Sequence, residues 1–181
     1  MERSARVATL RLAAFDGACV VTLNSMLGHR GCMLLARGIS RLGDGELWVA
    51  LILALALMPG DRGVRCALHV AAVALTGLLL YLLVKRRAGR PRPYRRLDGL
   101  QLCARPLDEF SFPSGHTLHA VAFAIVVPAY FPALGVLLLS FALLTGLVRV
   151  VLGLHYPSDV LAGIAIGAGV ASLSLALVPP M

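Results

Sequence analysis

Three clusters of polar residues stand out in a chain of 181 residues that is 59% hydrophobic. They are Lys85 to Pro93, then Pro113 to His116, and finally Arg149 with His155 and Asp159. Charged side chains within or at the edge of a hydrophobic bundle are energetically costly, so they commonly mark functional sites. The three clusters are therefore the candidates for a reaction centre.

The cations of the clusters suit the oxygens of a phosphoryl group. Lys85, Arg92 and Arg149 could surround such a group, and each guanidinium can bind two oxygens at once. Ser114 stands where the N-cap of a helix is expected, and Gly115 allows close approach of the backbone. Amide N–H groups at a helix start bind anionic oxygens. These five residues form the predicted phosphate-binding set.

The histidines of the clusters could supply a nucleophile and an acid. His155 precedes Pro157, which suits the first turn of a helix, and Asp159 falls in that turn. Asp159 is then near enough to accept a hydrogen bond from one nitrogen of His155. Such a bond fixes the tautomer and leaves the other nitrogen free to attack. His116 is available to protonate the leaving oxygen.

Each cluster taken alone has a simpler explanation. An arginine-rich loop commonly binds lipid headgroups, and His155 with Asp159 could form a structural hydrogen bond or half of a metal site. Some arginines are expected to attract an anion without taking part in the chemistry: Arg86, Arg87, Arg90, Arg95 and Arg96. Histidines without such partners are expected to be structural or interfacial: His29, His69 and His119. The three clusters favour catalysis in combination.

The elements that must position these clusters are membrane helices. The chain has 14% charged residues, against about a quarter in soluble domains, which excludes an ordinary cytosolic globule and a disordered chain. One span takes about 20 residues. The apolar stretches therefore predict an all-α, polytopic membrane bundle of about six transmembrane helices. Residues 1–181 are expected to form one integral-membrane domain.

The expected spans are 15–35, 42–60, 66–84, two within 117–148, and 160–181. The stretch 117–148 is too long for one span and suits two, hinged near Pro128 and Pro132. Residues 15–35 are the weakest candidate and could instead form an interfacial helix. Between 66 and 160 the alternation of spans places all three clusters on the same side of the membrane.

Charge and composition indicate which classes of ligand and cofactor the chain is expected to bind. The net charge is +8, and eight basic residues fall between 85 and 113, in a loop between spans. This placement favours a phosphate at the membrane surface over nucleic acid. No carboxylate cluster suits Mg²⁺ and the four cysteines lack a zinc-like spacing, so neither a metal nor another cofactor is expected. If six spans hold, five arginines mark the cytoplasmic face and leave the site outside: Arg3, Arg6, Arg11, Arg62 and Arg65.

The clusters resemble the signature of the type-2 phosphatidic acid phosphatase superfamily, which shares its core with bacterial acid phosphatases and vanadium haloperoxidases. Its motifs are K-x6-R-P, P-S-G-H and S-R-x5-H-x3-D. Lys85 to Pro93 match the first motif, 113–116 match the second, and 149–159 match the third. Val148 departs from the pattern, because the family usually has a Ser there that supports the adjacent Arg.

The resemblance implies a six-helix membrane bundle and metal-independent hydrolysis of a phosphomonoester or diphosphate. His155 would be the nucleophile that forms a phosphohistidine, Asp159 its orienting partner, and His116 the general acid. The five phosphate-binding residues would hold the phosphoryl oxygens and stabilise the charge of the transition state: Lys85, Arg92, Ser114, Gly115 and Arg149.

The expected function is that of a lipid phosphatase in a bacterial inner membrane, with the active site on the outer or periplasmic face. Family members act on phosphatidic acid, phosphatidylglycerophosphate, polyprenyl diphosphates and lipid A phosphates. Two alternatives stay open. The chain could pass the phosphoryl group to a second lipid, or it could be a catalytically silent lipid-binding or transport protein. The sequence leaves the physiological lipid and the oligomeric state open.

Overall fold

The computed structural model describes residues 2–106 and 108–180, and the described part is built from α-helices joined by loops and short 3₁₀ turns. The helices are α1 (Glu2–Asn24), α2 (Arg30–Leu42), α3 (Gly45–Ala56), α4 (Asp61–Ala88), α5 (Gly115–Tyr130), α6 (Gly135–Val151) and α7 (Pro157–Leu177). This all-α architecture confirms the predicted fold class.

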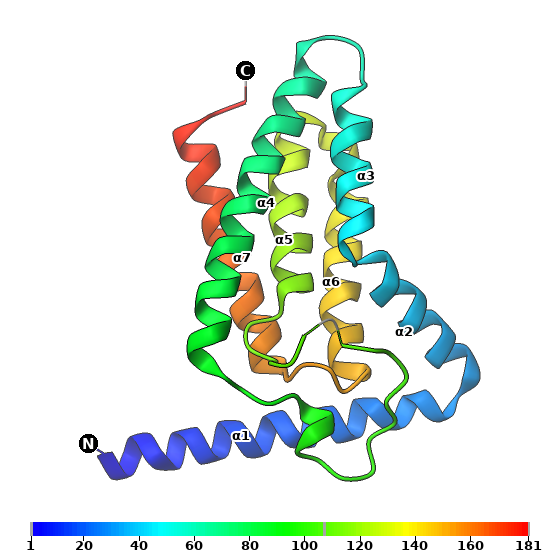
Figure 1. The fold of residues 1–181 in the computed structure, drawn as a ribbon, viewed down its shortest axis with the longest axis vertical. Coiled ribbons are helices and arrows are strands. Elements are labelled where there is room, and N and C mark those ends of the chain that lie inside the picture. Colours follow the sequence, from blue (N-terminus) through cyan, green and yellow to red (C-terminus); the bar gives the residue numbers. More distant parts are fainter. Residues whose placement is uncertain (1, 107, 181) are drawn as a thin grey trace.

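Helices α3 to α7 run side by side along the long axis of the molecule (Figure 1). Helix α5 lies among α4, α6 and α7, and α3 packs on α4. In the core, the rings of Trp48 on α3 and Phe123 on α5 lie 4.5 Å apart. Leucines on the outer faces are exposed, among them Leu79 at 60% and Leu137 at 66%. Lipid tails are as apolar as leucine, so this surface suits a bilayer.

Three bundle segments are long and apolar enough to cross a membrane: Asp61–Ala88, Pro132–Val151 and Pro157–Leu177. Helices α3 and α5 are apolar but shorter. Within the described residues the bundle therefore contains five helices, so the expected number of about six spans holds only approximately. The difference lies in the first predicted span.

The first predicted span, 15–35, is not one helix: it is divided among the end of α1, a 3₁₀ turn (Ser25–Gly28) and the start of α2. Residues 10–28 are apolar and long enough to span, but α1 passes transversely beneath α6 and α7 and contacts both (Figure 1). Two buried polar residues hold it there. Asp16 pairs with Arg90, with Oδ2 and Nη2 2.8 Å apart, and the Nδ2 of Asn24 donates to the carbonyl of Val151 at 2.9 Å. This transverse course is the one that the interfacial alternative predicts, while the length and hydropathy of residues 10–28 also suit a span.

The break between α5 and α6 lies where the sequence predicts it. Pro128 lies inside the last turn of α5, and Pro132 begins a short turn that leads to Gly135 and α6. Proline has no N–H to donate, and its ring clashes with the preceding turn. The predicted hinge near Pro128 and Pro132 is confirmed, and it sends α6 back toward the end of the bundle where α5 starts.

Glycines on α7 bring its backbone against α5. A methyl group built on Gly163 would lie 2.6 Å from the carbonyl oxygen of Ser114, and one on Gly167 would collide with the carbonyl of Leu118. The two glycines form a GxxxG pair, a pattern that allows close packing of helices in membranes. Its effect is to fix the first turn of α5 beside the first turn of α7.

Candidate active site

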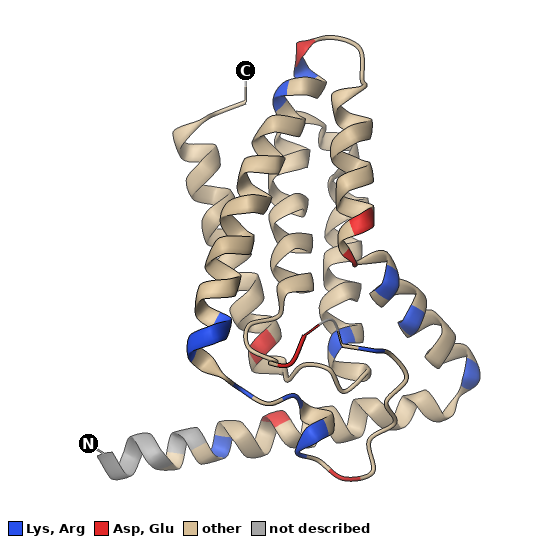
Figure 2. Cartoon of the chain, viewed as in Figure 1, with Lys and Arg blue, Asp and Glu red and all other residues tan. Residues whose placement is uncertain are grey.

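The three polar clusters meet at one end of the bundle. Lys85 ends α4, Ser114 caps α5, Arg149 ends α6, and His155 lies in the loop that leads to α7. Figure 2 shows charged residues gathered at this end, above α1, while the middle of the bundle is nearly free of them. The alternation of helices therefore brings the clusters together as the sequence predicts.

His155 is 1% exposed and held by its backbone surroundings. Its Nδ1 lies 2.6 Å from the carbonyl oxygen of Ser111. A carbonyl can only accept, so Nδ1 carries the proton and Nε2 keeps its lone pair. Nε2 lies 3.2 Å from Nη1 of Arg92 and 3.5 Å from Nη2 of Arg149. The free nitrogen thus faces two guanidinium groups.

The environment of His155 favours the neutral imidazole. Burial lowers its pKa well below the usual 6.5, and the positive charges of Arg149 and Arg92 lower it further. A neutral imidazole is the form that can act as a nucleophile. The same cations that disfavour its protonation would attract a phosphoryl group to it.

Asp159 occupies a different position from the one predicted. Its Oδ2 lies 3.8 Å from Nδ1 of His155, which is too long for a hydrogen bond. Oδ2 instead accepts from the N–H of Tyr156 at 2.8 Å, and Oδ1 pairs with Arg90 at 2.6 Å. The predicted direct hydrogen bond is therefore wrong for this structure. The carboxylate caps α7 and lies behind the imidazole, which is oriented by the carbonyl of Ser111.

Arg92 and Lys85 converge on one carboxylate that the sequence analysis did not single out. The Oδ1 of Asp108 lies 2.7 Å from Nη2 of Arg92 and 2.6 Å from Nζ of Lys85. Tyr81 donates its hydroxyl to Oδ2 at 2.5 Å. Burial alone would raise the pKa of Asp108, but these partners lower it to about 2. The two cations are thus held as a cradle around a carboxylate.

Arg149 is the third cation of this cradle, and it is 2% exposed. Its Nη1 donates to the hydroxyl of Ser40 at 2.8 Å. Val148, which stands where the family usually has Ser, is buried among apolar side chains. Ser40 on α2 therefore supplies a hydroxyl partner to Arg149 from 109 residues away.

His116 is paired with an acid from another helix. Its Nε2 lies 2.8 Å from Oδ1 of Asp44, the residue that precedes α3. A carboxylate beside an imidazole orients the ring. This contact leaves Nδ1 as the nitrogen that could face a leaving group.

Ser114 and Gly115 form the start of α5, tied to the start of α7. The N–H of Ser114 donates to the carbonyl of Asp159 at 3.0 Å. The ring of Tyr81 packs so closely on Gly115 that a methyl group there would lie 2.8 Å from it. Gly115 is thus needed for close packing, and the free amides of the first turn point an electropositive helix end at the site.

Arg90 has a structural position rather than the loose anion-attracting position expected for it. It pairs with Asp159 at 2.6 Å and with Asp16 on α1 at 2.8 Å. Burial lowers the pKa of Arg90, but the two carboxylates outweigh this and raise it overall. The side chain thereby joins the transverse helix to the cap of α7.

The residues that the sequence analysis missed share one property, which is that their partners are distant in the chain. They are Asp108, Asp44, Ser40 and Ser111. One general rule could have pointed to these acids in the sequence, because buried cations are normally paired with an opposite charge. With nine acidic residues in the chain, the acids nearest the basic loop could have been examined as partners of Lys85 and Arg92. Among the described residues, no group of three or more His, Cys, Asp or Glu is arranged to hold a metal ion.

An apolar groove of about 380 Å³ leads from the site into the bundle. Its walls come from α3, α4 and α5, and they include Trp48, Ile52, Leu75 and Leu78. His116 and Asp44 lie at its polar end. The groove thus connects a histidine of the site with the membrane-spanning part of the molecule.

Comparisons with known proteins show what the chain is similar to. A family model described as the PAP2 superfamily matches residues 66–180. Decaprenylphosphoryl-5-phosphoribose phosphatase of Mycobacterium tuberculosis is 34% identical over 162 residues, which cover 86% of each chain. Lipid A 1-phosphatase of Rhizobium johnstonii is 41% identical over 100 residues, covering 53% of this chain. This match spans 41% of the Rhizobium protein, well under half of its length.

Solved structures share the arrangement. The crystal structure of Aquifex aeolicus LpxE has a TM-score of 0.73 at 26% identity, covering 82% of this chain and 87% of that one. A PAP2-type phosphatidylglycerolphosphate phosphatase from Bacillus subtilis has a TM-score of 0.76 at 25% identity, covering 96% and 89%. Both are similar over most of their length, so the likeness extends over most of the fold.

Proposed function

The chain belongs to the PAP2 superfamily, and from that membership we propose that it is a membrane lipid phosphatase acting through a phosphohistidine intermediate. Its substrate would be a lipid phosphomonoester or diphosphate. One observation carries the proposal: the lone pair of His155 Nε2 faces Arg92 and Arg149 at 3.2 and 3.5 Å. A nucleophile between two phosphate-binding cations has the arrangement that phosphoryl transfer needs.

The proposed reaction has two displacements. Nε2 of His155 attacks phosphorus, the N–P bond forms, and the bond to the leaving oxygen breaks while His116 gives that oxygen a proton. Water then attacks the phosphohistidine with His116 as the base, and inorganic phosphate leaves. Lys85, Arg92 and Arg149, with the hydroxyl of Ser114 and the amide of Gly115, would stabilise the charge on the phosphoryl oxygens.

Two features support a lipid as the substrate. The apolar groove beside His116 would hold a hydrocarbon chain on the leaving-group side of the phosphorus. The similar proteins are described as phosphatases of lipid A, of decaprenylphosphoryl phosphoribose and of phosphatidylglycerolphosphate. We propose the same class of substrate here, with residues 1–181 acting as one membrane domain.

The experiment that tests this function is phosphate release by the purified protein in detergent. With a lipid phosphate as substrate and excess EDTA, the wild-type chain is expected to release inorganic phosphate, and vanadate is expected to inhibit it. His155→Ala should lose activity, whereas His29→Ala, which changes an exposed histidine, should retain it. Full activity of His155→Ala would contradict the mechanism. Transfer of labelled phosphate to an added acceptor lipid would indicate a phosphotransferase instead.

The proposed location is a bacterial inner membrane with the site on the outer face. Arg11 lies on α1, which passes the site end of the bundle (Figure 1), whereas Arg62 and Arg65 lie in the first turns of α4, at the end opposite Lys85. Arg11 therefore does not lie on the same side as Arg62 and Arg65, and the side chains of Arg3 and Arg6 lie outside the described residues. Arg62 and Arg65 remain as the support, since substrate binding explains many basic residues at the site end.

Cysteine labelling tests this orientation. A cysteine at Glu109, in the loop beside the site, is introduced into a variant without its native cysteines. A second variant carries Asp61→Cys at the far end. A maleimide that cannot cross membranes is expected to label the first and not the second in intact spheroplasts. The reverse pattern would place the site on the cytoplasmic face.

A further inference from the structure

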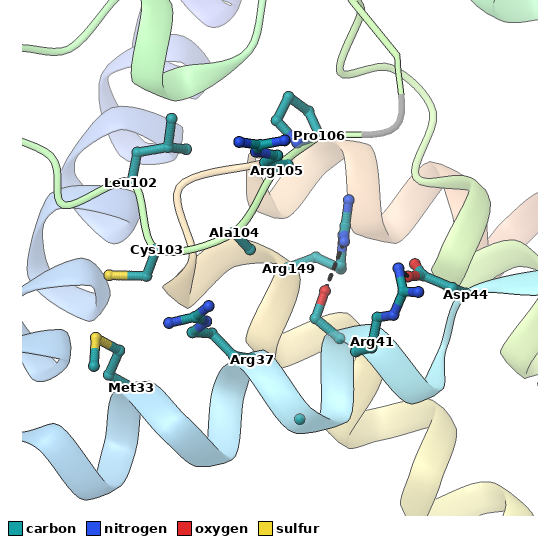
Figure 3. A pocket seen from close by; sticks show the side chains of 12 residues that line it. Met33, Arg37, Arg41, Asp44, Leu102, Cys103, Ala104, Arg105, Pro106 and Arg149 are labelled. Carbon is teal, nitrogen blue, oxygen red and sulfur yellow. Dashed lines mark hydrogen bonds and ion pairs between the residues drawn. The ribbon is translucent and has the colours of Figure 1, made fainter.

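A second cavity opens beside the catalytic residues, between α2 and the loop Leu102–Pro106 (Figure 3). Its volume is about 940 Å³. Figure 3 shows Arg37 and Arg41 on α2, Arg105 on the loop opposite, and Arg149 between them. We call the part lined by Arg37, Arg41 and Arg105 the arginine chamber. None of these three belongs to the sequence signature.

The arginine chamber carries positive charge that its own walls do not neutralise. Asp44 is the acid among its lining residues, and it pairs with Arg41 at 3.1 Å. Arg37 and Arg105 are exposed, and neither makes an ion pair or side-chain hydrogen bond with another residue that the structure describes. Guanidinium groups on facing walls form a site suited to a planar or tetrahedral oxyanion.

The chamber is continuous with the reaction centre through Arg149. This side chain lines the cavity, and its Nη2 also lies 3.5 Å from the nucleophilic nitrogen of His155. Its Nε is buried and has no partner among the described residues. A buried N–H without a partner is unfavourable. A ligand oxygen at the boundary between the chamber and the cradle would satisfy it.

The position of Asp44 places the chamber on the leaving-group side. Asp44 lines the chamber, lines the apolar groove, and binds the proposed general acid His116 at 2.8 Å. A substrate whose leaving oxygen lies near His116 can therefore extend its polar part into the chamber and its hydrocarbon part into the groove.

We propose that the arginine chamber binds a second anionic group of the substrate, in the part that leaves with the lipid. The substrate class is then a lipid whose terminal phosphate is joined, through a short polyol or sugar, to a phosphodiester next to the hydrocarbon chain. This inference rests on the proposed phosphatase function and narrows its substrate. An anionic membrane surface could use the same arginines, so the test separates the two sources.

The kinetic test compares a substrate with two phosphates, phosphatidylglycerophosphate, with one that has a single phosphate, phosphatidic acid, in micelles of a neutral detergent. Arg37→Ala/Arg105→Ala is expected to lower kcat/KM for phosphatidylglycerophosphate about tenfold or more, through KM, since two charge-assisted contacts are lost. Its effect on phosphatidic acid should stay below about twofold. Arg30→Ala, an exposed arginine on the same helix, is the matched control. Equal losses on both substrates would indicate general attraction to an anionic surface. They would refute the proposal that the arginine chamber binds a second anionic group of the substrate.

A binding measurement separates the chamber from the catalytic proposal. In a His155→Ala background, calorimetry compares glycerol bisphosphate with glycerol 3-phosphate. The bisphosphate should bind about tenfold more tightly, and Arg37→Ala/Arg105→Ala should abolish this difference while Arg30→Ala preserves it. Equal binding of the two, or no binding of either, would overturn the inference. Selective binding by a chain that hydrolyses no lipid phosphate would leave the chamber standing and refute the phosphatase.

Discussion

Asp108 introduces a carboxylate into the proposed phosphate-binding site. It accepts from Lys85, Arg92 and Tyr81 at 2.5 to 2.7 Å, so its oxygens take the place that phosphoryl oxygens would need on these cations. Burying Lys85 and Arg92 without a counter-charge would be strongly unfavourable. Asp108 thus neutralises Lys85 and Arg92, and under the proposed mechanism the substrate phosphate would displace it.

Asp108→Asn is therefore expected to tighten inhibition by vanadate by at least about threefold, because a neutral amide competes less well than a carboxylate for these cations. The inhibition constant in the phosphate-release assay measures this. Glu109→Gln, which alters an exposed acid paired with Arg95, is the control. Weaker inhibition in Asp108→Asn would show that the carboxylate assists binding of the anion instead of competing with it.

The lowered pKa of Asp108 also predicts that the stability of the fold depends on pH. The pKa of Asp108 falls to about 2 in the folded chain, below the ordinary value of about 3.9. The ionised carboxylate therefore stabilises the fold above about pH 4, and this contribution is lost as the pH falls toward about 2. Thermal unfolding between these values should show a smaller decrease with acid in Asp108→Asn than in the wild type.

Ser40 is the second residue whose substitution tests the site. Ser40→Ala removes the hydroxyl that accepts from Nη1 of Arg149 and leaves another buried donor unpaired, which costs about 1–3 kcal/mol. Since Arg149 faces the nucleophile, kcat/KM should fall about tenfold. Ser25→Ala, at an exposed serine that bonds within its own turn, should leave the kinetics unchanged. Wild-type kinetics in Ser40→Ala would show that Ser40 does not position Arg149 for the reaction.

At the scale of elements, the contact between α5 and α7 positions the first turn of α5, which carries the proposed phosphate-binding residues Ser114 and Gly115. Gly163 lies against the carbonyl of Ser114, and the N–H of Ser114 donates to Asp159. The start of each helix is therefore fixed by the other. A change in the spacing of the two helices would move Ser114 and Gly115 relative to the loop that carries His155.

Gly163→Ala is expected to destabilise the chain by about 1–3 kcal/mol, because its methyl group requires the helices to separate. Activity should fall as well, since Ser114 moves with the backbone of α5. Gly169→Ala on the same helix has open space around it and serves as the control. Thermal unfolding and kcat measure the two effects. Equal behaviour of the two variants would contradict the role given to the helix contact.

How far the elements could be predicted depends on whether their causes are local. The break near Pro128 and Pro132 follows from two prolines, and the start of α7 follows from Pro157. The course of α1 does not follow from its own composition, since it depends on the pairing of Asp16 with Arg90, 74 residues away. The partners Asp44 and Asp108 likewise depend on contacts that no local pattern encodes, whereas the three clusters were recognisable because their spacing is short.

At the scale of the whole molecule, polar and apolar binding surfaces meet at His116. The arginine chamber lies at the end of the bundle, and the groove between α3, α4 and α5 runs into the apolar part. This division matches an amphiphile whose phosphate reaches the membrane surface while its chain remains in lipid. The transverse helix α1 lies across the same end of the bundle (Figure 1).

Blocking the groove should affect lipids selectively. Leu78→Trp fills part of the groove and is expected to raise KM for a long-chain lipid phosphate about tenfold, which corresponds to loss of contact with about two CH₂ groups at about 0.8 kcal/mol each. A soluble aryl phosphate should be hydrolysed as before. Leu79→Trp, at an exposed neighbouring position outside the groove, is the control. Equal effects on both substrates would argue against a chain-binding groove.

The proposed mechanism requires His155 to be the covalent nucleophile. The direct measurement is a single turnover with radiolabelled lipid phosphate, stopped in alkali, where phosphohistidine survives, and followed by peptide mapping. We predict the label on the peptide that contains His155, with no labelling of His155→Ala. Label on another residue, or turnover by His155→Ala at the wild-type rate, would contradict the central claim.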